Sequence, residues 1–199
     1  MRSEASTERA MRAIRIWMMA VLLAGTAGCA SFSPHDPSPV PLVPKVDLQR
    51  FTGDWYVVAQ IPTPLDGGVF NAIEHYDLDA QGQIVTTYTS RKGGFDGPPQ
   101  RFTPTTRIMP DSGNALWAVR FAWYWPFWYE YRVAYLAPDE SVAIIARSAL
   151  DYLWVFSREP VMSDAQLEPY IEMMQRWGYD TKRLERVPQQ PLAQRGPRP

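Results

Sequence analysis

The fold of this chain is constrained above all by a series of eight short segments. Each segment is apolar or alternates between apolar and polar residues. Turns rich in glycine, proline and aspartate separate the segments, and this pattern is typical of β-strands. Most of the connections are tight, so we expect consecutive strands to pair antiparallel. The predicted strands are residues 55–61, 72–78, 83–90, 102–108, 116–122, 129–137, 142–147 and 152–157.

One helix is predicted after the last of these strands. Ser163 and Gln166 form a capping-box pattern, and apolar residues then recur at helical spacing until Gly178. Pro169 lies beyond the first turn, so the helix is expected either to be distorted early or to begin at the proline. A last short strand is expected over residues 184–187.

Eight antiparallel strands in sequential order favour a barrel, because closure removes exposed strand edges. Pro104 lacks a backbone donor and weakens the fourth strand. With 199 residues, of which 46% are hydrophobic, the chain can bury one sizeable core. We therefore expect an all-β domain over residues 47–190, an eight-stranded antiparallel up-and-down β-barrel with one C-terminal α-helix packed outside. A disordered tail over residues 191–199 would follow.

The N-terminus has the pattern of a secretory signal. Two arginines precede an apolar run over residues 16–24, and small residues then lead to Cys29. The run is shorter than the about 20 apolar residues that a membrane-spanning helix needs. We therefore expect a signal peptide over residues 1–28, with either Met1 or Met11 as its start.

Cys29 is the only cysteine, so the chain can form no internal disulfide. Residues 26–29, TAGC, resemble the lipobox of bacterial lipoproteins, although Thr26 stands where leucine is usual. The resemblance implies that Cys29 becomes the first mature residue and carries acyl chains that hold the protein on a membrane. Since Ala30 rather than aspartate follows, it also implies the outer membrane, facing the periplasm. An ordinary secreted protein with a stray thiol is the alternative.

The segment after Cys29 is rich in proline, with five prolines between residues 34 and 44. Such a composition favours the extended polyproline conformation, which rises by about 3.1 Å per residue. Residues 29–46 are therefore predicted to be a lipidated cysteine followed by a tether.

Three motifs in the predicted domain resemble the lipocalin family. Residues 51–56, FTGDWY, resemble the Gly-x-Trp-Tyr motif that opens the first strand of lipocalins. Residues 151–158, DYLWVFSR, are similar to the eighth-strand motif of bacterial outer-membrane lipocalins, and residues 126–136 are similar to their fifth loop and sixth strand. The resemblance spans essentially the whole predicted domain and implies a lipocalin barrel.

Gly53, Trp55 and Arg158 are the residues of this resemblance that would form the closed base of the barrel. In an eight-stranded meander the first strand leaves the end at which the eighth arrives, so Trp55 and Arg158 should meet at one rim. A guanidinium over an indole face gains about 0.5 to 2 kcal/mol from cation–π attraction. We expect these residues to be structural.

Eight of the eleven residues in 121–131, FAWYWPFWYEY, are aromatic. If Trp55 marks the base, the loop between the fifth and sixth strands lies at the open mouth. Its rings could grip an entering ligand, dip into a lipid interface or pack on one another as a lid. The mouth aromatics of this prediction are Trp123, Trp125, Phe127 and Trp128.

Alternate residues of a barrel strand face the interior. We therefore count alternate residues from Trp55 on the first strand and from Arg158 on the eighth strand, and take the matching apolar residues on the sixth strand. These residues are the candidate ligand contacts. Tyrosine hydroxyls of this set, or Arg120 if it faces inward, could orient a polar head group. The candidates are Val57, Ala59, Tyr131, Val133, Tyr135, Trp154 and Phe156.

Several functional classes are disfavoured. The formal net charge is −1, so nucleic acid is not an expected partner. His35 and His75 have no partner at metal-ligand spacing, so neither a metal nor a cofactor is expected. The Gly-x-Ser-x-Gly motif is absent, and no catalytic constellation emerges.

The sequence therefore predicts an outer-membrane lipocalin that binds a lipid-like apolar ligand, such as a fatty acid like palmitate or a lysophospholipid, for storage or transport in the cell envelope. It is not expected to be an enzyme, and pairing into a homodimer is left open. The first alternative is an envelope interaction protein that docks on membrane or a partner through the mouth aromatics, without cargo. The second is an undetected hydrolase or isomerase acting on lipid.

Overall fold

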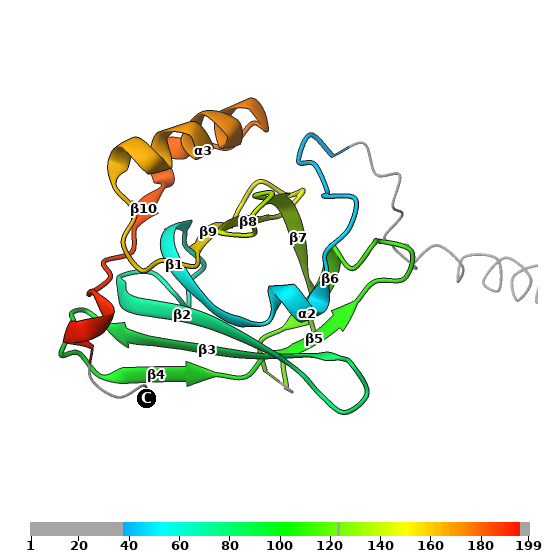
Figure 1. The fold of residues 1–199 in the computed structure, drawn as a ribbon, viewed down its shortest axis with the longest axis horizontal. Helices are drawn as coiled ribbons and strands as arrows, with labels where there is room; N and C mark the ends of the chain where they lie inside the picture. The colour runs from blue at the N-terminus through cyan, green and yellow to red at the C-terminus, as the bar shows by residue number, and fades with distance from the viewer. Residues whose placement is uncertain (1–37, 123, 196–199) are drawn as a thin grey trace, which may run out of the picture. The chain divides into compact units, whose positions relative to one another are not determined.

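The computed structural model describes residues 38–122 and 124–195. Within them, β-strands dominate, and the larger of two short α-helices follows the barrel strands (Figure 1). The elements are α2 (Leu48–Phe51), β1 (Gly53–Ile61), β2 (Val69–Leu78), β3 (Ile84–Lys92), β4 (Pro99–Phe102), β5 (Thr105–Ile108), β6 (Leu116–Arg120), β7 (Tyr129–Leu136), β8 (Val142–Ala146), β9 (Leu153–Ser157), α3 (Asp164–Arg176), η1 (Thr181–Arg183), β10 (Glu185–Arg186) and η2 (Leu192–Gln194).

The strands form one antiparallel sheet in the order β4-β3-β2-β1-β9-β8-β7-β6-β5, with β10 paired to β1. The first and last strands of this order, β4 and β5, are joined through Thr103 and Pro104, so the sheet curls round on itself (Figure 1). The hydroxyls of Thr86 on β3 and Thr106 on β5 lie 3.1 Å apart across the junction. The predicted all-β barrel with an outer C-terminal helix is confirmed.

The predicted fourth strand, residues 102–108, is the one strand that the structure divides. Its first part belongs to β4, which pairs with β3, and its second part is β5, which pairs with β6. Pro104 lies between them and cannot donate to a ladder. The chain therefore bends at the proline, and each half serves one edge of the sheet.

Helix α3 begins directly after Ser163, as the capping box predicts. The Ser163 hydroxyl accepts from the Gln166 amide, and the Gln166 side chain accepts from the Ser163 amide at 2.8 Å. The helix runs through Pro169 rather than beginning there. Its buried residues, Leu167 and Met174, pack against the outer face of the barrel.

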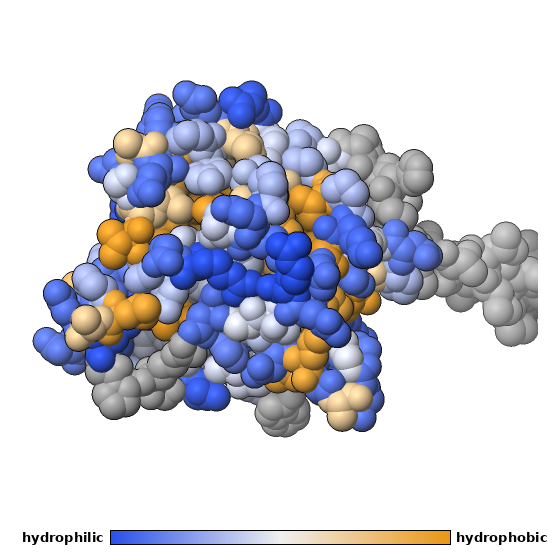
Figure 2. Space-filling view, in the orientation of Figure 1, coloured by the Kyte–Doolittle hydropathy of each residue, from blue (hydrophilic) through white to orange (hydrophobic). Residues whose placement is uncertain are grey.

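The barrel wall separates two apolar clusters. An inner cluster fills the base of the barrel and includes Phe51, Trp55 and Trp117. An outer cluster lies between the wall and α3, and it includes Tyr56 and Ile144. In the view of Figure 2, polar residues cover most of the surface, and apolar residues show in the seam between α3 and the sheet. Both faces of β1, β8 and β9 are therefore buried.

The N-terminal segment packs along the barrel from residue 40 onward. Val40 and Val46 are buried, the Val43 amide donates to the Val133 carbonyl at 3.0 Å, and the Val46 amide donates to the Gly113 carbonyl at 2.8 Å. The folded unit therefore begins before residue 47, and the described part of the predicted tether is packed rather than free. The predicted signal peptide and Cys29 lie outside the described residues.

The chain beyond residue 190 is also ordered as far as the structure describes it. Arg195 lies over the Tyr56 ring, 4.6 Å from its centroid, and donates to the Gln190 carbonyl at 2.9 Å. The predicted disordered tail over residues 191–199 is therefore wrong for residues 191–195, because the Arg195 guanidinium is held by ring and amide contacts.

Candidate ligand-binding site

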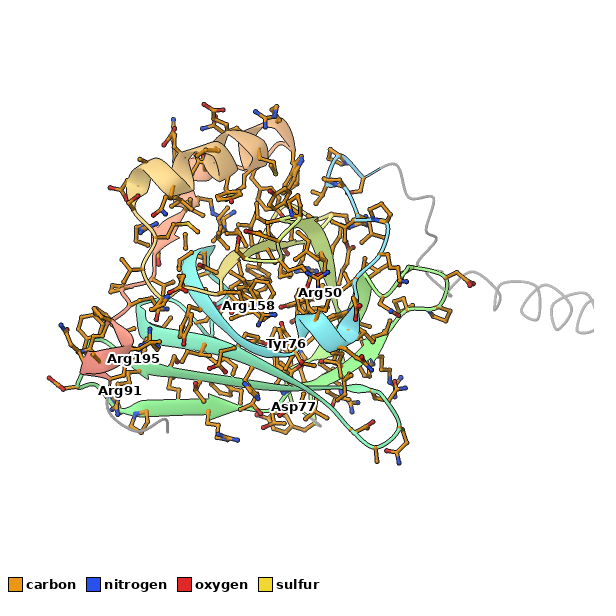
Figure 3. All side chains as sticks on the ribbon, in the orientation of Figure 1. Arg50, Tyr76, Asp77, Arg91, Arg158 and Arg195 are labelled. Carbon is orange, nitrogen blue, oxygen red and sulfur yellow. The ribbon has the colours of Figure 1, made fainter. Side chains whose placement is uncertain are left out.

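The base of the barrel is closed by Arg158. Its guanidinium lies 3.7 Å from the centroid of the Trp55 ring, which confirms the predicted contact. The same group donates to the carbonyls of Thr52 at 3.0 Å, Asp54 at 2.9 Å and Arg50 at 2.8 Å, and Figure 3 shows Arg158 near Arg50 at this end. One side chain thus ties the end of β9 to the start of β1.

Gly53 lies beneath this contact with a φ of +89°, a conformation that side chains with a Cβ rarely adopt. A Cβ at this position would lie 3.6 Å from Arg158 Nη1. The motif glycine is therefore needed for its backbone conformation beside the guanidinium.

A floor of aromatic rings lies above the base. Phe51 is 4.9 Å from Trp55 and 5.3 Å from Tyr76, measured between ring centroids. Trp117 and Tyr131 stack with centroids 5.3 Å apart and planes 5° apart. The Tyr76 and Tyr131 hydroxyls share a short hydrogen bond, so the two polar atoms satisfy each other within the apolar floor.

Above this floor is a cavity of about 320 Å³. Its volume lies at the lower end of the range of about 300 to 1,000 Å³ that is typical of small-molecule sites. The cavity walls are mainly aromatic and aliphatic. The lining residues are Thr63, Pro64, Leu65, Asp66, Glu74, Tyr76, Thr86, Tyr88, Phe102, Pro104, Thr106, Trp117, Val119, Phe121, Ala122, Tyr124, Trp125, Tyr129, Tyr131, Tyr152, Trp154 and Phe156.

Five of the predicted ligand contacts face the interior. Tyr131, Trp154 and Phe156 line the cavity. Val57 and Val133 belong to the inner cluster but do not reach the cavity wall. The counting of alternate residues therefore gives the correct face for these five side chains.

Ala59 and Tyr135 correct the prediction, because both face outward. They belong to the outer cluster, where the Tyr135 ring lies 5.6 Å from the ring of Tyr170 on α3. The pairing register shifts between Val57 and Ala59 on β1 and between Val133 and Tyr135 on β7. Each bulge adds one residue, which moves the following side chains to the opposite face.

The aromatic run lies at the open mouth, as predicted, because the antiparallel order puts loops 62–68, 93–98, 121–128 and 147–152 at the end opposite Trp55. Its rings take different positions. Trp125 lines the cavity, and its indole donates to the Tyr129 hydroxyl at 3.1 Å, whereas Phe127 is 62% exposed.

Trp128 does not face the cavity. It lies beside two guanidinium groups, that of Arg107 at 4.3 Å and that of Arg120 at 4.9 Å from its ring centroid. Arg120 is therefore engaged outside the cavity and is not among the lining residues, so it does not orient a head group there. Trp123 lies outside the described residues.

Asp66 is a polar residue of the site that the sequence interpretation did not find. It comes from the mouth loop between β1 and β2 and is buried. One carboxylate oxygen accepts from the Thr63 amide at 2.6 Å and the Thr63 hydroxyl at 2.7 Å, and the other accepts from the Trp154 indole at 2.7 Å. Three donors thus hold the carboxylate at the cavity wall.

Glu74 is the second such residue. Burial raises its pKa from 4.5 to about 8, and the charge of Asp66 contributes further. The Glu74 carboxyl is therefore largely neutral at pH 7. The signal was present in the sequence: Glu74 alternates with Ala72 and Tyr76, which places one acid on the inner, otherwise apolar face of that strand.

Tyr88 is the cross-strand partner of Glu74 and also lines the cavity. Its ring is buried, its hydroxyl has no hydrogen-bond partner, and burial raises its pKa. The ring stacks on that of Phe102, with centroids 5.9 Å apart. The hydroxyl is therefore available to a ligand.

His75 does not line the cavity and lies between two carboxylates instead, 2.5 Å from Asp54 and 3.1 Å from Asp77. Across residues 38–122 and 124–195, no three histidine, cysteine or acidic residues are grouped to hold a metal ion. In the same part of the chain, no helix is both long enough and apolar enough to cross a membrane.

Comparisons with known proteins agree with this architecture. The family model of the lipocalin-like domain matches residues 46–189. The chain is 28% identical to the outer membrane lipoprotein Blc of Vibrio cholerae serotype O1 over 184 residues, which cover 90% of this chain and all of that protein. It is 26% identical to Blc of Escherichia coli K12, with 78% of this chain and 86% of that protein covered.

Among solved structures, insecticyanin from the tobacco hornworm Manduca sexta has the same fold. The TM-score is 0.58 at 15% sequence identity, over 74% of this chain and 83% of that one. The fold, the base contact and the family match agree. The chain therefore belongs to the lipocalin family, and within it is similar to bacterial outer membrane lipoproteins.

Proposed function

We propose that this protein is an outer-membrane lipocalin that binds a lipid-like apolar ligand, a fatty acid or a lysophospholipid, and stores or carries it within the cell envelope. The observation that carries the proposal is the largely apolar cavity of about 320 Å³ between the aromatic floor and the mouth. Contact of an alkyl chain with these walls would contribute about 25 cal/mol for each Å² of apolar surface removed from water.

A ligand-uptake experiment tests the carrier function. The full-length chain with Cys29→Ser, recovered without detergent and freed of lipid, is titrated with palmitate and with a lysophospholipid. We expect saturable quenching of tryptophan fluorescence, because Trp117, Trp125 and Trp154 line the cavity.

Val119→Trp supplies the blocking variant, since Val119 lines the cavity and a larger ring there would fill it. Val161→Trp is the matched control, because Val161 is 58% exposed on the surface. Uptake that is abolished by the first substitution and unaffected by the second supports the proposal. Uptake that is absent, or equal in both variants, contradicts it.

The proposed location rests on the relatives that are outer membrane lipoproteins and on the lipobox-like sequence ending at Cys29. Acyl chains on Cys29 would anchor the protein with the barrel in the periplasm. Fractionation of cells expressing the wild type and Cys29→Ser tests the anchor. The wild type should sediment with outer membranes and the variant should be soluble; a variant that stays with the membrane would contradict acylation at Cys29.

A second candidate function is docking of the mouth on a membrane, which the exposed apolar side chains of two mouth loops favour. Leu65 is 49% exposed, Tyr124 70%, Trp125 42% and Phe127 62%. In the Cys29→Ser background, Phe127→Ser should reduce sedimentation with vesicles of outer-membrane composition, whereas Val161→Ser should not. Equal sedimentation of both variants would argue against docking.

A further inference from the structure

The cavity is acidic. The described residues that line it include the carboxyl groups of Asp66 and Glu74 and six tyrosines, but no lysine, arginine or histidine. The guanidinium groups close to this wall lie over aromatic rings: those of Arg107 and Arg120 over Trp128, and that of Arg147 over Tyr129 and Tyr152. A ligand carrying a carboxylate inside the cavity would therefore meet like charge, and no cation among the described lining residues.

An acidic side chain and a hydroxyl without a hydrogen-bond partner line the cavity from neighbouring strands. Glu74 lies two positions before Tyr76 on β2, so both side chains face inward, and the Tyr76 ring belongs to the floor. In the sheet, Glu74 pairs with Tyr88 on β3. Inward side chains of directly opposite residues on neighbouring strands have Cβ atoms about 4.5 to 5.5 Å apart. Glu74 and Tyr88 thus place a carboxyl and a hydroxyl without a hydrogen-bond partner at paired positions of a mainly apolar wall, and these two groups form one polar spot.

The other polar groups facing this spot are already engaged. The Tyr76 and Tyr131 hydroxyls bond to each other, and the Asp66 carboxylate accepts from Thr63 and Trp154. A buried hydroxyl without a partner costs about 1 to 3 kcal/mol, so a ligand that bonds it gains affinity. What the described lining lacks is a positive charge.

From this geometry, and on the basis of the carrier function proposed above, we infer that the polar spot of Glu74 and Tyr88 receives an alkyl ammonium group, so that the preferred ligands are single-chain cationic amphiphiles. The ammonium group donates to the Glu74 carboxylate and to the Tyr88 hydroxyl oxygen, and the alkyl chain lies along the aromatic wall toward the mouth. Fatty acids bind less well, and with the carboxylate at the mouth.

Binding of this kind is coupled to a proton. The Glu74 carboxyl is largely protonated below about pH 8. When the ammonium group enters, Glu74 loses its proton to solvent and the ion pair forms. The groups that face Glu74 and set this balance are Asp66 from the mouth loop, Tyr76 on its own strand, Tyr88 on β3 and Tyr131 on β7.

The test compares octylamine, octanol and octanoate by calorimetric titration of the full-length Cys29→Ser chain. Because only the ionised fraction of Glu74 accepts the ammonium group, octylamine affinity should rise roughly thirtyfold from about pH 6.5 to about pH 9. Octanol affinity should change little. Octanoate affinity should fall over the same range, since ionised Glu74 repels it.

Three variants complete the experiment. Glu74→Gln should remove the pH dependence for octylamine and lower its affinity at the higher pH by about tenfold or more. Tyr88→Phe should weaken octylamine while keeping the pH dependence, because the carboxyl remains. Glu168→Gln, which removes the same charge from the exposed face of α3, should match the parent chain.

The outcomes separate this inference from the carrier function. Octylamine affinity that is independent of pH, or that Glu74→Gln leaves unchanged, overturns the inference. Octanoate binding as tightly as octylamine at the higher pH does so as well. In both cases saturable uptake of octanol or octanoate leaves the carrier function standing. Failure of all three compounds to bind overturns both proposals.

Discussion

At the scale of single residues, the barrel changes the chemistry of Glu74. Folding removes its carboxyl from water and places it near the charge of Asp66, and both effects favour the neutral form. The folded protein therefore holds a proton that the unfolded chain releases above its ordinary pKa of 4.5. Stability should depend on pH through this group.

The sign of this pH dependence follows from the direction in which folding shifts the pKa of Glu74. Because the folded pKa is about 8 and the unfolded value is 4.5, the contribution is fully present below about pH 4.5 and is lost as the pH rises to about 8. The slope is at most about 1.4 kcal/mol per pH unit. In the Glu74→Gln variant, the unfolding free energy measured with urea should not show this decrease between about pH 4.5 and about pH 8. Glu168→Gln is the control, and an identical pH profile for Glu74→Gln and the parent would refute the shift.

Arg158 carries a second prediction at this scale. Arg158→Met removes donors from three carbonyl groups and the cation–π contact with Trp55. Hydrogen bonds from charged groups contribute about 1.5 to 3 kcal/mol each at most, so we expect unfolding free energy to fall by about 3 kcal/mol.

Arg176→Met is the matched control for this change. Arg176 forms an exposed i,i+4 pair with Glu172 at 3.9 Å, and such pairs contribute about 0.3 to 0.5 kcal/mol. Urea unfolding of both variants gives the comparison. Similar losses for the two arginines would mean that Arg158 does not tie the base together.

At the scale of elements, the predictions from sequence were correct where the pattern that carries them lies within one segment. The capping box at Ser163 gave the start of α3, and the weakness assigned to Pro104 marked the bend between β4 and β5. Both are effects of a residue on its own backbone. The prediction of inward-facing residues on β1 and β7 was wrong for Ala59 and Tyr135, because a bulge precedes each of them. A bulge depends on the pairing of two strands, so the pattern within one segment does not reveal it.

The cap of α3 gives the prediction at this scale. Ser163→Ala removes the acceptor of the Gln166 amide and should lower unfolding free energy by about 1 kcal/mol. Glu168→Ala, on the exposed face of the same helix, should stay within about 0.5 kcal/mol of the parent. Thermal unfolding with amide exchange in residues 164–167 would measure both. Loss confined to Glu168→Ala would contradict the role of the cap.

At the scale of the whole molecule, the N-terminal segment is part of the fold. Residues 40–46 bury two valines and bond to β7 and to the turn after β5. The part of the predicted tether that the structure describes from Val40 onward is therefore barrel wall rather than spacer.

Two truncations test this arrangement. Removal of residues 1–37 should leave stability unchanged, whereas removal of residues 1–46 should lower unfolding free energy by about 3 kcal/mol or more. The reason is that burial of each valine contributes about 1.5 to 3 kcal/mol. Urea unfolding measures the difference, and equal stability of the two truncated chains would show that the segment does not support the barrel.

By itself, the sequence determined the strands and the helix, because these follow from backbone preferences. The contact of Trp55 with Arg158 was predicted from the resemblance to lipocalins together with the antiparallel order of a meander. Only the tertiary structure decided which side chains reach the cavity and which protonation state they have. The bulges that turn Ala59 and Tyr135 outward come from pairing with other strands. The neutral Glu74 beside Tyr88 comes from removal of water by distant segments, since desolvation is a property of the assembled barrel.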